Sequence, residues 1–340
     1  MKAAIKAIEY YLPEHTLSTS QLGEEFPEWP AEKLEHMTGV RLRHVAGPDE
    51  CASDLGVAAG GKLFASGACQ PTEVDYLLLC TESPDHFLPA TACLIQDRLG
   101  IPTTAGALDF NLGCSGYVYG LGLARGLIET GQARNVLLIT AETLTKFIHP
   151  GDKSARALFG DAAAATLLTT VKEPEPLLGP FVFGTDGSGA PNLIVPAGGL
   201  RRPRSPETAI PQQDSSGNVR TQENLFMDGL EIFNFTLRIV PAMVDSLLQR
   251  AGKTREEVDL YVFHQANQYI LDHLRKRLKV PGERFILAMS QCGNTVSSSL
   301  PIALKQAQEA GQLAPGRLAM LVGFGAGYSW AAGLVRWKAF

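Results

Sequence analysis

The sequence predicts an α/β fold made of two similar halves, because buried strands alternate with helices and part of the pattern repeats. Four continuous apolar runs indicate strands that are covered on both faces, at residues 74–80, 135–140, 258–263 and 318–322. Helical periodicity is found among these strands, at residues 115–131, 232–251 and 297–311. Alternation of strands and helices along one chain is typical of the α/β class.

The ends of these elements carry signals of their own. Gly131 and Gly311 follow two of the helical stretches, where a C-terminal glycine is expected. Residues 196–224 are polar and rich in Pro and Gly, which predicts a long loop. Loops longer than about 12–15 residues are often functional or mobile.

Three short motifs recur in the same order about 180 residues apart. Glu73-Val74-Asp75 recurs as Glu257-Val258-Asp259, and Glu129-Thr130-Gly131-Gln132 recurs as Glu309-Ala310-Gly311-Gln312. With the second offset, Gly113-Cys114-Ser115 aligns with Gly293-Asn294-Thr295. A period this long is not that of a solenoid. We therefore expect two related halves that pack face to face, with Cys114 opposite Asn294 near a pseudo-twofold axis.

Composition and charge exclude several classes of protein. The 340 residues are 45% hydrophobic and 19% charged, and the formal net charge of −5 argues against a nucleic-acid binder. No apolar run reaches the roughly 18 residues of a membrane helix, and the N-terminus has no signal-peptide core. Six cysteines without a CxxC pair fit a reduced set, so we expect a cytoplasmic protein.

Cys114 is the candidate nucleophile. A short apolar strand, a turn flanked by Gly113 and Gly116, and then a helix surround it. A thiol at a helix start faces the positive end of the helix dipole and unpaired N–H groups, and both favour the reactive thiolate. The other five cysteines lack this context and are expected to be structural.

Two further side chains and one loop fit the same site. His264 ends a predicted strand, where ligands gather in α/β sheets and where histidine exchanges protons at neutral pH. Asn294 precedes a helix and aligns with Cys114, although a simple N-cap is the alternative role. The glycine-rich segment 323–330 follows the last strand, and its N–H groups are candidates for an oxyanion hole.

Competing motifs fail in detail. The segment 56–62 matches GxxxxGK, but Leu63 stands where a Ser or Thr would hold magnesium, and the segment reads as helix interior. Gly323-Phe324-Gly325 begins like a dinucleotide fingerprint, yet Tyr328 replaces the third glycine. No spacing of His, Cys, Asp or Glu indicates zinc.

At Cys114, His264 and Asn294 the sequence resembles the thiolase superfamily, and within it the condensing enzymes of the β-ketoacyl-acyl-carrier-protein synthase III type. The resemblance extends over nearly the whole chain. Further matching motifs lie at residues 38–44, 89–92, 159–161, 227–229, 264–267, 293–295 and 323–330.

The resemblance implies a thiolase-like five-layer αβαβα fold, with one half at residues 1–175 carrying the cysteine and another at 176–340 carrying His and Asn. It implies a decarboxylative Claisen condensation in fatty-acid or specialised acyl biosynthesis. Cys114 takes the acyl group, and His264 and Asn294 stabilise the enolate of a malonyl thioester. The backbone N–H groups of Cys114 and Ala326 form the oxyanion hole. No cofactor beyond the thioester substrates is implied.

Partner and substrate residues follow from the same resemblance. The family forms homodimers, and Leu88 stands where a side chain gates the acyl pocket of the partner subunit. Lys153, Arg156 and Asn267 are expected to contact the CoA or carrier-protein moiety. A basic helix is expected to dock an acidic acyl carrier protein or, alternatively, to be a solvated face; its residues are Arg275, Lys276, Arg277 and Lys279.

The sequence leaves open which thioester donates the acyl group and how the acyl-enzyme then reacts. Relatives that use acyl-CoA often clamp adenine between a Trp and an Arg, whereas here Trp29 precedes Thr38 by nine residues and Lys153 replaces the Arg. Glu82 resembles the catalytic Glu of hydroxymethylglutaryl-CoA synthase, so a non-decarboxylative condensation with Glu82 as general base is one alternative. Acyl transfer to an alcohol or amine is another, and a non-catalytic carrier-binding subunit is a third.

Overall fold

Two β-sheets form the centre of the protein, whose structure is a computed structural model describing residues 1–340. The first sheet contains, in spatial order, β1 (Lys2–Tyr11), β7 (Ala162–Val171), β6 (Asn135–Glu142), β4 (Tyr76–Cys80) and β5 (Gly106–Phe110). The second contains β13 (Leu260–Phe263), β14 (Leu318–Gly325), β15 (Ser329–Arg336) and β8 (Leu178–Thr185). All four strands predicted from the sequence are confirmed, with boundaries that differ by two or three residues.

The repeated Glu-Val-Asp motif has the same role in both sheets. The Asp75 carboxylate accepts the N–H of Asn135, at the start of β6, and its own N–H donates to the Asn135 carbonyl. Asp259 makes the equivalent pair of bonds with Leu318, at the start of β14. The strands β4 and β13 therefore begin two residues later than the apolar runs, because these aspartates brace the neighbouring parallel strand.

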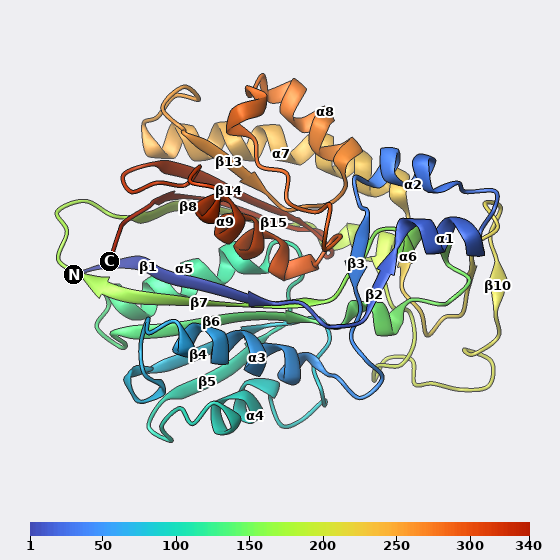
Figure 1. Cartoon of the computed structure of the whole chain (residues 1–340), viewed down its shortest axis with the longest axis horizontal. Helices are drawn as coiled ribbons and strands as arrows, with labels where there is room; N and C mark the ends of the chain where they lie inside the picture. The colour runs from blue at the N-terminus through green and yellow to red at the C-terminus, as the bar shows by residue number, and fades with distance from the viewer.

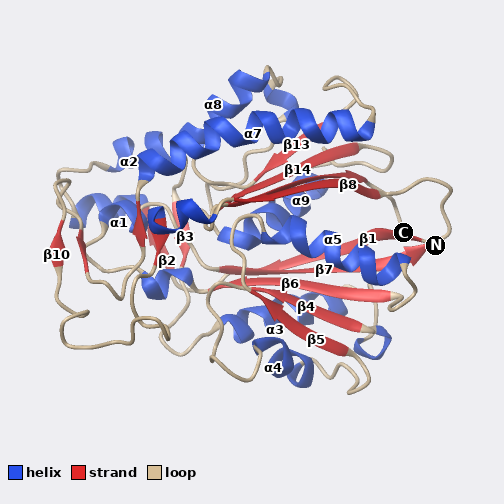
Figure 2. Cartoon of the chain, turned by 180° about the vertical axis from the view of Figure 1, so that it is seen from behind, coloured by secondary structure: helices blue, strands red, loops and turns tan.

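Helices cover and separate the two sheets in five layers (Figure 1). The outer face of the first sheet carries α3 (Ala52–Ala65) and α4 (Thr91–Arg98), and that of the second carries α7 (Gly229–Ala251) and α8 (Gln268–Leu278). Between the sheets lie α5 (Gly116–Glu129) and α9 (Ser299–Glu309), as the view from behind also shows (Figure 2). This is the αβαβα arrangement expected from the resemblance.

The middle layer is apolar because both of its faces are buried. Tyr117, Val118 and Leu121 of α5 and Leu300 and Leu304 of α9 are fully buried in the core between the sheets. Each large apolar side chain buried in this way contributes roughly 1.5–3 kcal/mol relative to exposure. The two central helices are thus held firmly, and their N-terminal ends lie at fixed positions for the candidate site.

Helix ends follow the predicted signals. Gly131 and Gly311 have left-handed backbone angles, with φ of +78° and +72°, just beyond α5 and α9. The helix predicted at 297–311 begins with a short 3₁₀ turn, η5 (Val296–Ser298), before α9 proper. Segment 56–62 lies inside α3, which confirms the prediction that it is helix interior.

Short elements complete the chain. They are β2 (Thr16–Ser18), α1 (Thr19–Glu25), α2 (Ala31–Thr38), β3 (Leu42–His44), α6 (Lys153–Arg156), β9 (Leu193–Ile194), β10 (Gln212–Gln213), β11 (Val219–Arg220) and β12 (Phe226–Met227). No helix of the structure is both long enough and apolar enough to cross a membrane.

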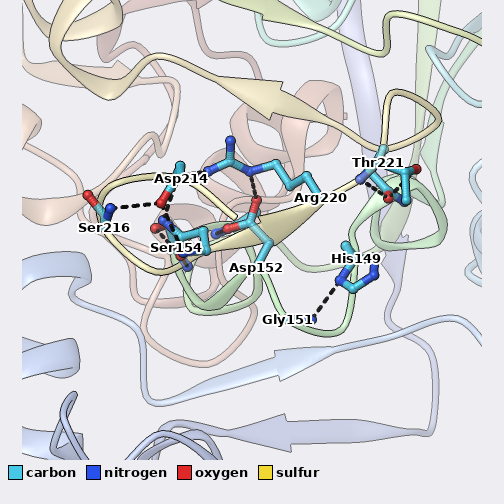
Figure 3. Close-up of polar contacts among 11 residues, drawn as sticks. His149, Gly151, Asp152, Ser154, Asp214, Ser216, Arg220 and Thr221 are labelled. Carbon is cyan, nitrogen blue, oxygen red and sulfur yellow. Dashed lines mark hydrogen bonds and ion pairs between the residues drawn. The ribbon is translucent and has the colours of Figure 1, made fainter. Parts of the chain in front are cut away.

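The segment 196–224 is more ordered than the loop predicted from its composition. It contains the β10–β11 hairpin, which Arg220 ties down through ion pairs with Asp152, at 2.6 Å, and with Asp214 (Figure 3). Asn218 accepts hydrogen bonds from the N–H and hydroxyl of Ser154. Composition alone missed the hairpin because its partners lie more than 60 residues away in the sequence.

Candidate active site

Cys114 lies between β5 and α5, at the N-terminal end of the central helix. Ser115 is the N-cap residue of α5, and its hydroxyl contacts that of Ser329 at 2.6 Å. The thiol residue is 7% exposed. Gly113 is needed for space, because a Cβ at this position would lie 2.2 Å from the Glu82 carboxylate. The strand–turn–helix setting predicted for Cys114 is therefore confirmed.

The surroundings of Cys114 do not favour thiolate, contrary to the expectation from its helix position. Burial raises the pKa of the Cys114 thiol well above its usual value, and the Glu82 and Glu142 carboxylates raise it further. A helix N-terminus amounts to about half a positive charge, which two nearby carboxylates and the loss of water outweigh. Cys114 is therefore a thiol at neutral pH, and any attack by its sulfur has to include loss of this proton.

The end of β14 approaches Cys114 closely. A Cβ on Gly325 would lie 2.8 Å from both Cβ and Sγ of Cys114. The adjacent Ala326 lines the same cavity as Cys114, which fits the predicted use of its N–H in an oxyanion hole. Phe324, one residue before Gly325, packs edge-on against the His264 ring with centroids 5.6 Å apart. The strand end thus links the nucleophile to the histidine.

His264 follows β13 and is 2% exposed. Its backbone N–H donates to Val322 of β14, and Nδ1 lies 2.7 Å from the Ser299 hydroxyl. Burial lowers the pKa of His264 to about 3, although a backbone hydrogen bond at Val296 acts in the opposite direction. The imidazole is therefore neutral at physiological pH, and one ring nitrogen is a hydrogen-bond donor while the other is an acceptor.

Asn294 lies beside His264. Its Nδ2 is 3.5 Å from His264 Nε2 and donates to the Ala266 carbonyl at 3.3 Å. The Asn294 Oδ1 accepts the Val296 N–H at 2.9 Å. The bonds to Ala266 and Val296 set the orientation of the amide, so that its NH₂ group lies next to Nε2 of the imidazole. Asn294 therefore also caps the start of η5, as the alternative role predicted, while its Nδ2 faces His264.

A cavity of about 1030 Å³ opens onto Cys114. Its walls are mostly apolar and include Leu144, Phe147, Phe159, Leu193, Val195 and Leu225. The exposed Leu88 contributes to the rim, together with Phe87. Such a volume and lining suit an aliphatic chain attached to the cysteine.

Two acidic side chains border the nucleophile. Glu142 is fully buried and accepts hydrogen bonds from the Glu82 N–H, the Ser83 hydroxyl and the Ser297 hydroxyl. Burial raises its pKa well above the usual value, and Glu82 adds to the shift. The Glu82 carboxyl lines the cavity, and burial raises its pKa to about 7. Glu82 thus keeps its proton to a higher pH than an ordinary carboxyl group does.

The predicted CoA or carrier contacts are largely engaged within the chain. Lys153 is buried, forms an ion pair with Glu28 at 2.7 Å and lies 5.6 Å from the centre of the Trp29 ring. Arg156 forms an ion pair with Glu25. The fold therefore brings Trp29 beside Lys153 despite the unmatched spacing in the sequence.

The remaining predicted contacts lie on α8. The Asn267 side chain caps the helix by accepting the Ile270 N–H at 2.8 Å. Lys276, Arg277 and Lys279 are exposed at the C-terminal end of α8, whereas Arg275 is half-buried. A short basic surface thus exists where the sequence predicted one.

Sequence reasoning missed three buried residues that shape the site. Ser299 contacts His264, and Glu142 accepts the backbone N–H of Glu82; neither lies in a recognisable motif. Arg43 is fully buried and donates to the carbonyls of Ala157 and Leu17. Its Cγ also lies against Gly293, next to Asn294. The only signal in the sequence that could have identified one of the three is the position of Arg43 within the matching motif at residues 38–44.

The five-layer fold and the buried Cys, His and Asn side chains define an acyl-transferring enzyme of the thiolase-like class. Profiles described as 3-oxoacyl-[acyl-carrier-protein (ACP)] synthase III and its C-terminal part match residues 108–187 and 248–337. The Beta-ketoacyl-[acyl-carrier-protein] synthase III of Caldanaerobacter subterraneus subsp. tengcongensis is 36% identical, over 99% of this chain and 98% of its own length.

Solved structures agree with the sequence relatives. A crystal structure of 3-oxoacyl-(acyl-carrier-protein) synthase III has 54% identity and a TM-score of 0.98, covering 99% of this chain and 100% of its own. A 3-oxoacyl-(acyl-carrier protein) synthase from Burkholderia xenovorans LB400 has 37% identity and a TM-score of 0.91, covering 99% and 95%. The chain belongs to the 3-oxoacyl-[acyl-carrier-protein] synthase III family.

Proposed function

We propose that the protein condenses a Cys114-bound acyl group with a malonyl thioester, releases CO2 and forms a β-ketoacyl thioester for fatty-acid or specialised acyl biosynthesis. The observation that supports this proposal most is the pairing of two neutral donors, His264 and Asn294. They are linked to Cys114 through Phe324 and Gly325 and through Val296, which lines the cavity of Cys114. Two neutral donors 3.5 Å apart are suited to one carbonyl oxygen that gains negative charge.

In the first step the Cys114 sulfur attacks the carbonyl carbon of an acyl thioester. The tetrahedral oxyanion is held by the backbone N–H groups of Cys114 and Ala326. The C–S bond to the donor breaks, and the thiol proton of Cys114 leaves with the donor sulfur. The product is an acyl-enzyme, as in other two-step cysteine acyltransferases.

In the second step a malonyl thioester enters the emptied donor site. Its C–COO⁻ bond breaks, and the electron pair passes into the thioester carbonyl as CO2 departs. His264 and Asn294 donate hydrogen bonds to the resulting enolate oxygen, and each such donor is commonly worth about 2.7–4 kcal/mol. The enolate carbon then attacks the acyl carbonyl, and Cys114 leaves as thiolate. This thiolate takes up one proton from water, which restores the thiol and closes the cycle.

Two sets of residues are proposed to bind the group that carries the acyl chain, which is either CoA or an acyl carrier protein. The exposed Lys276, Arg277 and Lys279 support docking of an acidic carrier protein, with Arg275 beside them. Lys153, Arg156 and Asn267 remain proposed contacts for the CoA or pantetheine end, although each first has to leave or share its present partner. The apolar cavity supports an acyl chain of medium length or longer.

A homodimer is part of the proposal. A second apolar groove of about 820 Å³ lies along α5 and β5, lined by Phe110, Leu112, Tyr119, Leu123 and Phe183 among others. Leu123 and Phe183 are each 48% exposed, and Phe87 and Leu88 project from the loop before α4 with about four fifths of their surface in solvent. Pairing of two copies through this face buries these side chains and brings Leu88 to the partner's acyl cavity.

The division into halves and the location are also proposals. We place the halves at residues 1–175 and 176–340, because the first sheet ends at Val171 and the second begins at Leu178. All six cysteines are free thiols, which supports a reducing, cytoplasmic environment.

Glu82 supports a second candidate function. Its carboxyl lines the cavity beside Cys114 and has a pKa of about 7, which suits a general base. Such a base removes an α-proton from an acceptor thioester without decarboxylation, or a proton from an alcohol or amine that attacks the acyl-enzyme. Glu82→Gln distinguishes these reactions. Condensation with malonyl thioester at an unchanged rate in this variant removes Glu82 from the mechanism. Acyl transfer to an acetyl thioester, an alcohol or an amine that is lost in this variant supports the second function.

The proposed function is tested by mass and by released CO2. Incubation with acetyl-CoA, octanoyl-CoA and their carrier-protein thioesters is expected to add one acyl group, which Cys114→Ser abolishes. Cys69→Ser is the matched control, since Cys69 is similarly buried (6% against 7%) but lies far from the cavity. Malonyl-carrier protein labelled in its free carboxylate is expected to lose label as CO2. No acyl mass on Cys114 and no CO2 release would overturn the proposal and favour a non-catalytic carrier-binding subunit.

A further inference from the structure

Three consecutive buried serines connect the start of α9 with β6 and with the residue that follows β13. Ser297, Ser298 and Ser299 are between 0% and 2% exposed. The Ser297 hydroxyl donates to Glu142 at 2.6 Å, and the Ser298 hydroxyl contacts that of Thr140 at 2.9 Å. Ser299 alone contacts a catalytic side chain, through the 2.7 Å bond to His264 Nδ1.

The position of the hydroxyl hydrogen of Ser299 follows from its neighbours. The Gln265 N–H points at Ser299 Oγ at 3.4 Å, so this oxygen already accepts a hydrogen bond. The only other partner within hydrogen-bond distance of the hydroxyl is His264 Nδ1. The Ser299 hydroxyl therefore donates to Nδ1. A neutral imidazole that accepts at Nδ1 carries its hydrogen on Nε2.

This tautomer decides whether Asn294 is available to the substrate. Asn294 Nδ2 faces Nε2 at 3.5 Å, which is long for a hydrogen bond. With hydrogen on Nε2, both nitrogens are donors, they do not bond to each other, and both can donate to one substrate oxygen. The Val296 backbone, which also contacts the imidazole, is then the competing acceptor. With hydrogen on Nδ1, the bare Nε2 accepts from Asn294, and the site loses both donors to an internal contact.

We propose that Ser299 is a positioning residue that holds His264 in the Nε2–H tautomer, so that His264 and Asn294 together bind the enolate oxygen. This inference rests on the proposed function, since the enolate arises in its second step. It predicts that Ser299 matters for decarboxylation and condensation but not for the reactivity of Cys114.

The kinetic test compares Ser299→Ala with Ser298→Ala, which removes an equally buried hydroxyl from the next position but touches no catalytic side chain. Cys114 reactivity is measured by alkylation with iodoacetamide, and the second step by CO2 released from malonyl-carrier protein. Ser299→Ala is expected to lower kcat for CO2 release about tenfold, with KM and alkylation within about twofold of wild type. In Ser298→Ala, any change in the rate of CO2 release is expected to be matched by an equal change in the rate of Cys114 alkylation. Ser299→Thr, which keeps a hydroxyl, is expected to release CO2 at the wild-type rate.

The tautomer itself is read by ¹⁵N NMR of histidine-labelled protein, with His264→Gln used to assign the His264 signals. Wild type is expected to show hydrogen on Nε2 and an accepting Nδ1, and Ser299→Ala to lose the hydrogen-bond shift at Nδ1. Hydrogen on Nδ1 in wild type overturns the inference, even if no variant folds. So does CO2 release by Ser299→Ala at the wild-type rate. Absence of both alkylation and CO2 release in wild type instead counts against the proposed function, while the NMR result stands separately.

Discussion

Gly325→Ala tests whether the end of β14 positions the nucleophile. The added Cβ would lie 2.8 Å from Cβ and Sγ of Cys114, whereas ordinary contact begins near 3.4 Å, so the two residues must separate by about 0.6 Å. Misplacing a reacting group by 1 Å costs about 10²-fold in rate. We therefore expect acylation of Cys114 to fall by about 10- to 100-fold.

The assay follows the mass of the intact protein with time, using iodoacetamide and acetyl-CoA in parallel, and a melting curve for each variant. Gly61→Ala is the matched control, because a Cβ at this exposed position of α3 meets nothing within 4 Å. If Gly325→Ala keeps the wild-type acylation rate at an unchanged melting temperature, close approach of this strand end does not position Cys114, and the reasoning fails.

Three other outcomes are expected. Gly61→Ala raises the free energy of unfolding by up to about 1 kcal/mol in urea titration, and a decrease contradicts the open site seen on α3. Arg220→Met leaves the buried Asp152 carboxylate without its ion-pair partner, so the free energy of unfolding is expected to fall by about 3 kcal/mol. Proteolysis within residues 196–224 is expected to become faster. An unaltered digestion rate means that other contacts hold the hairpin. In the folded chain burial raises the pKa of Glu82 to about 7, from 4.5 otherwise. The native state therefore binds the proton more tightly, and stability falls as pH rises through this range. Glu82→Gln removes this loss, so its stability relative to wild type increases from about pH 5 to pH 8; an equal difference at both pH values contradicts the shift.

Local sequence patterns were sufficient for the elements and for the identity of the catalytic candidates. Apolar runs predicted β4, β6, β13 and β14, because a strand buried on both faces has no exposed positions for polar residues. Cys114 was identified because a Gly-flanked turn between a strand and a helix is a local feature. The order of the motifs at Cys114, His264 and Asn294 then carried the resemblance that the fold and the relatives confirmed.

Other properties were beyond local patterns because they depend on distant groups. The helix position of Cys114 pointed to a thiolate, yet burial and the Glu82 and Glu142 carboxylates raise its pKa. Glu142 is 60 residues from Glu82 and 155 from Ser297, its hydrogen-bond partners. Trp29 and Lys153 did not match the expected spacing, but folding places them 5.6 Å apart.

The sequence by itself determined that this protein is an α/β chain of two related halves and pointed to a cysteine, a histidine and an asparagine as the candidate site. These properties follow from periodicity and from residues adjacent in the chain. Only the tertiary structure decided the protonation of the thiol, the contact of Ser299 with His264, the shape of the acyl cavity and the order within residues 196–224. The physical reason is that burial, charge and hydrogen-bond direction at a site are set by residues from several elements, which become neighbours only when the two sheets close on the central helices.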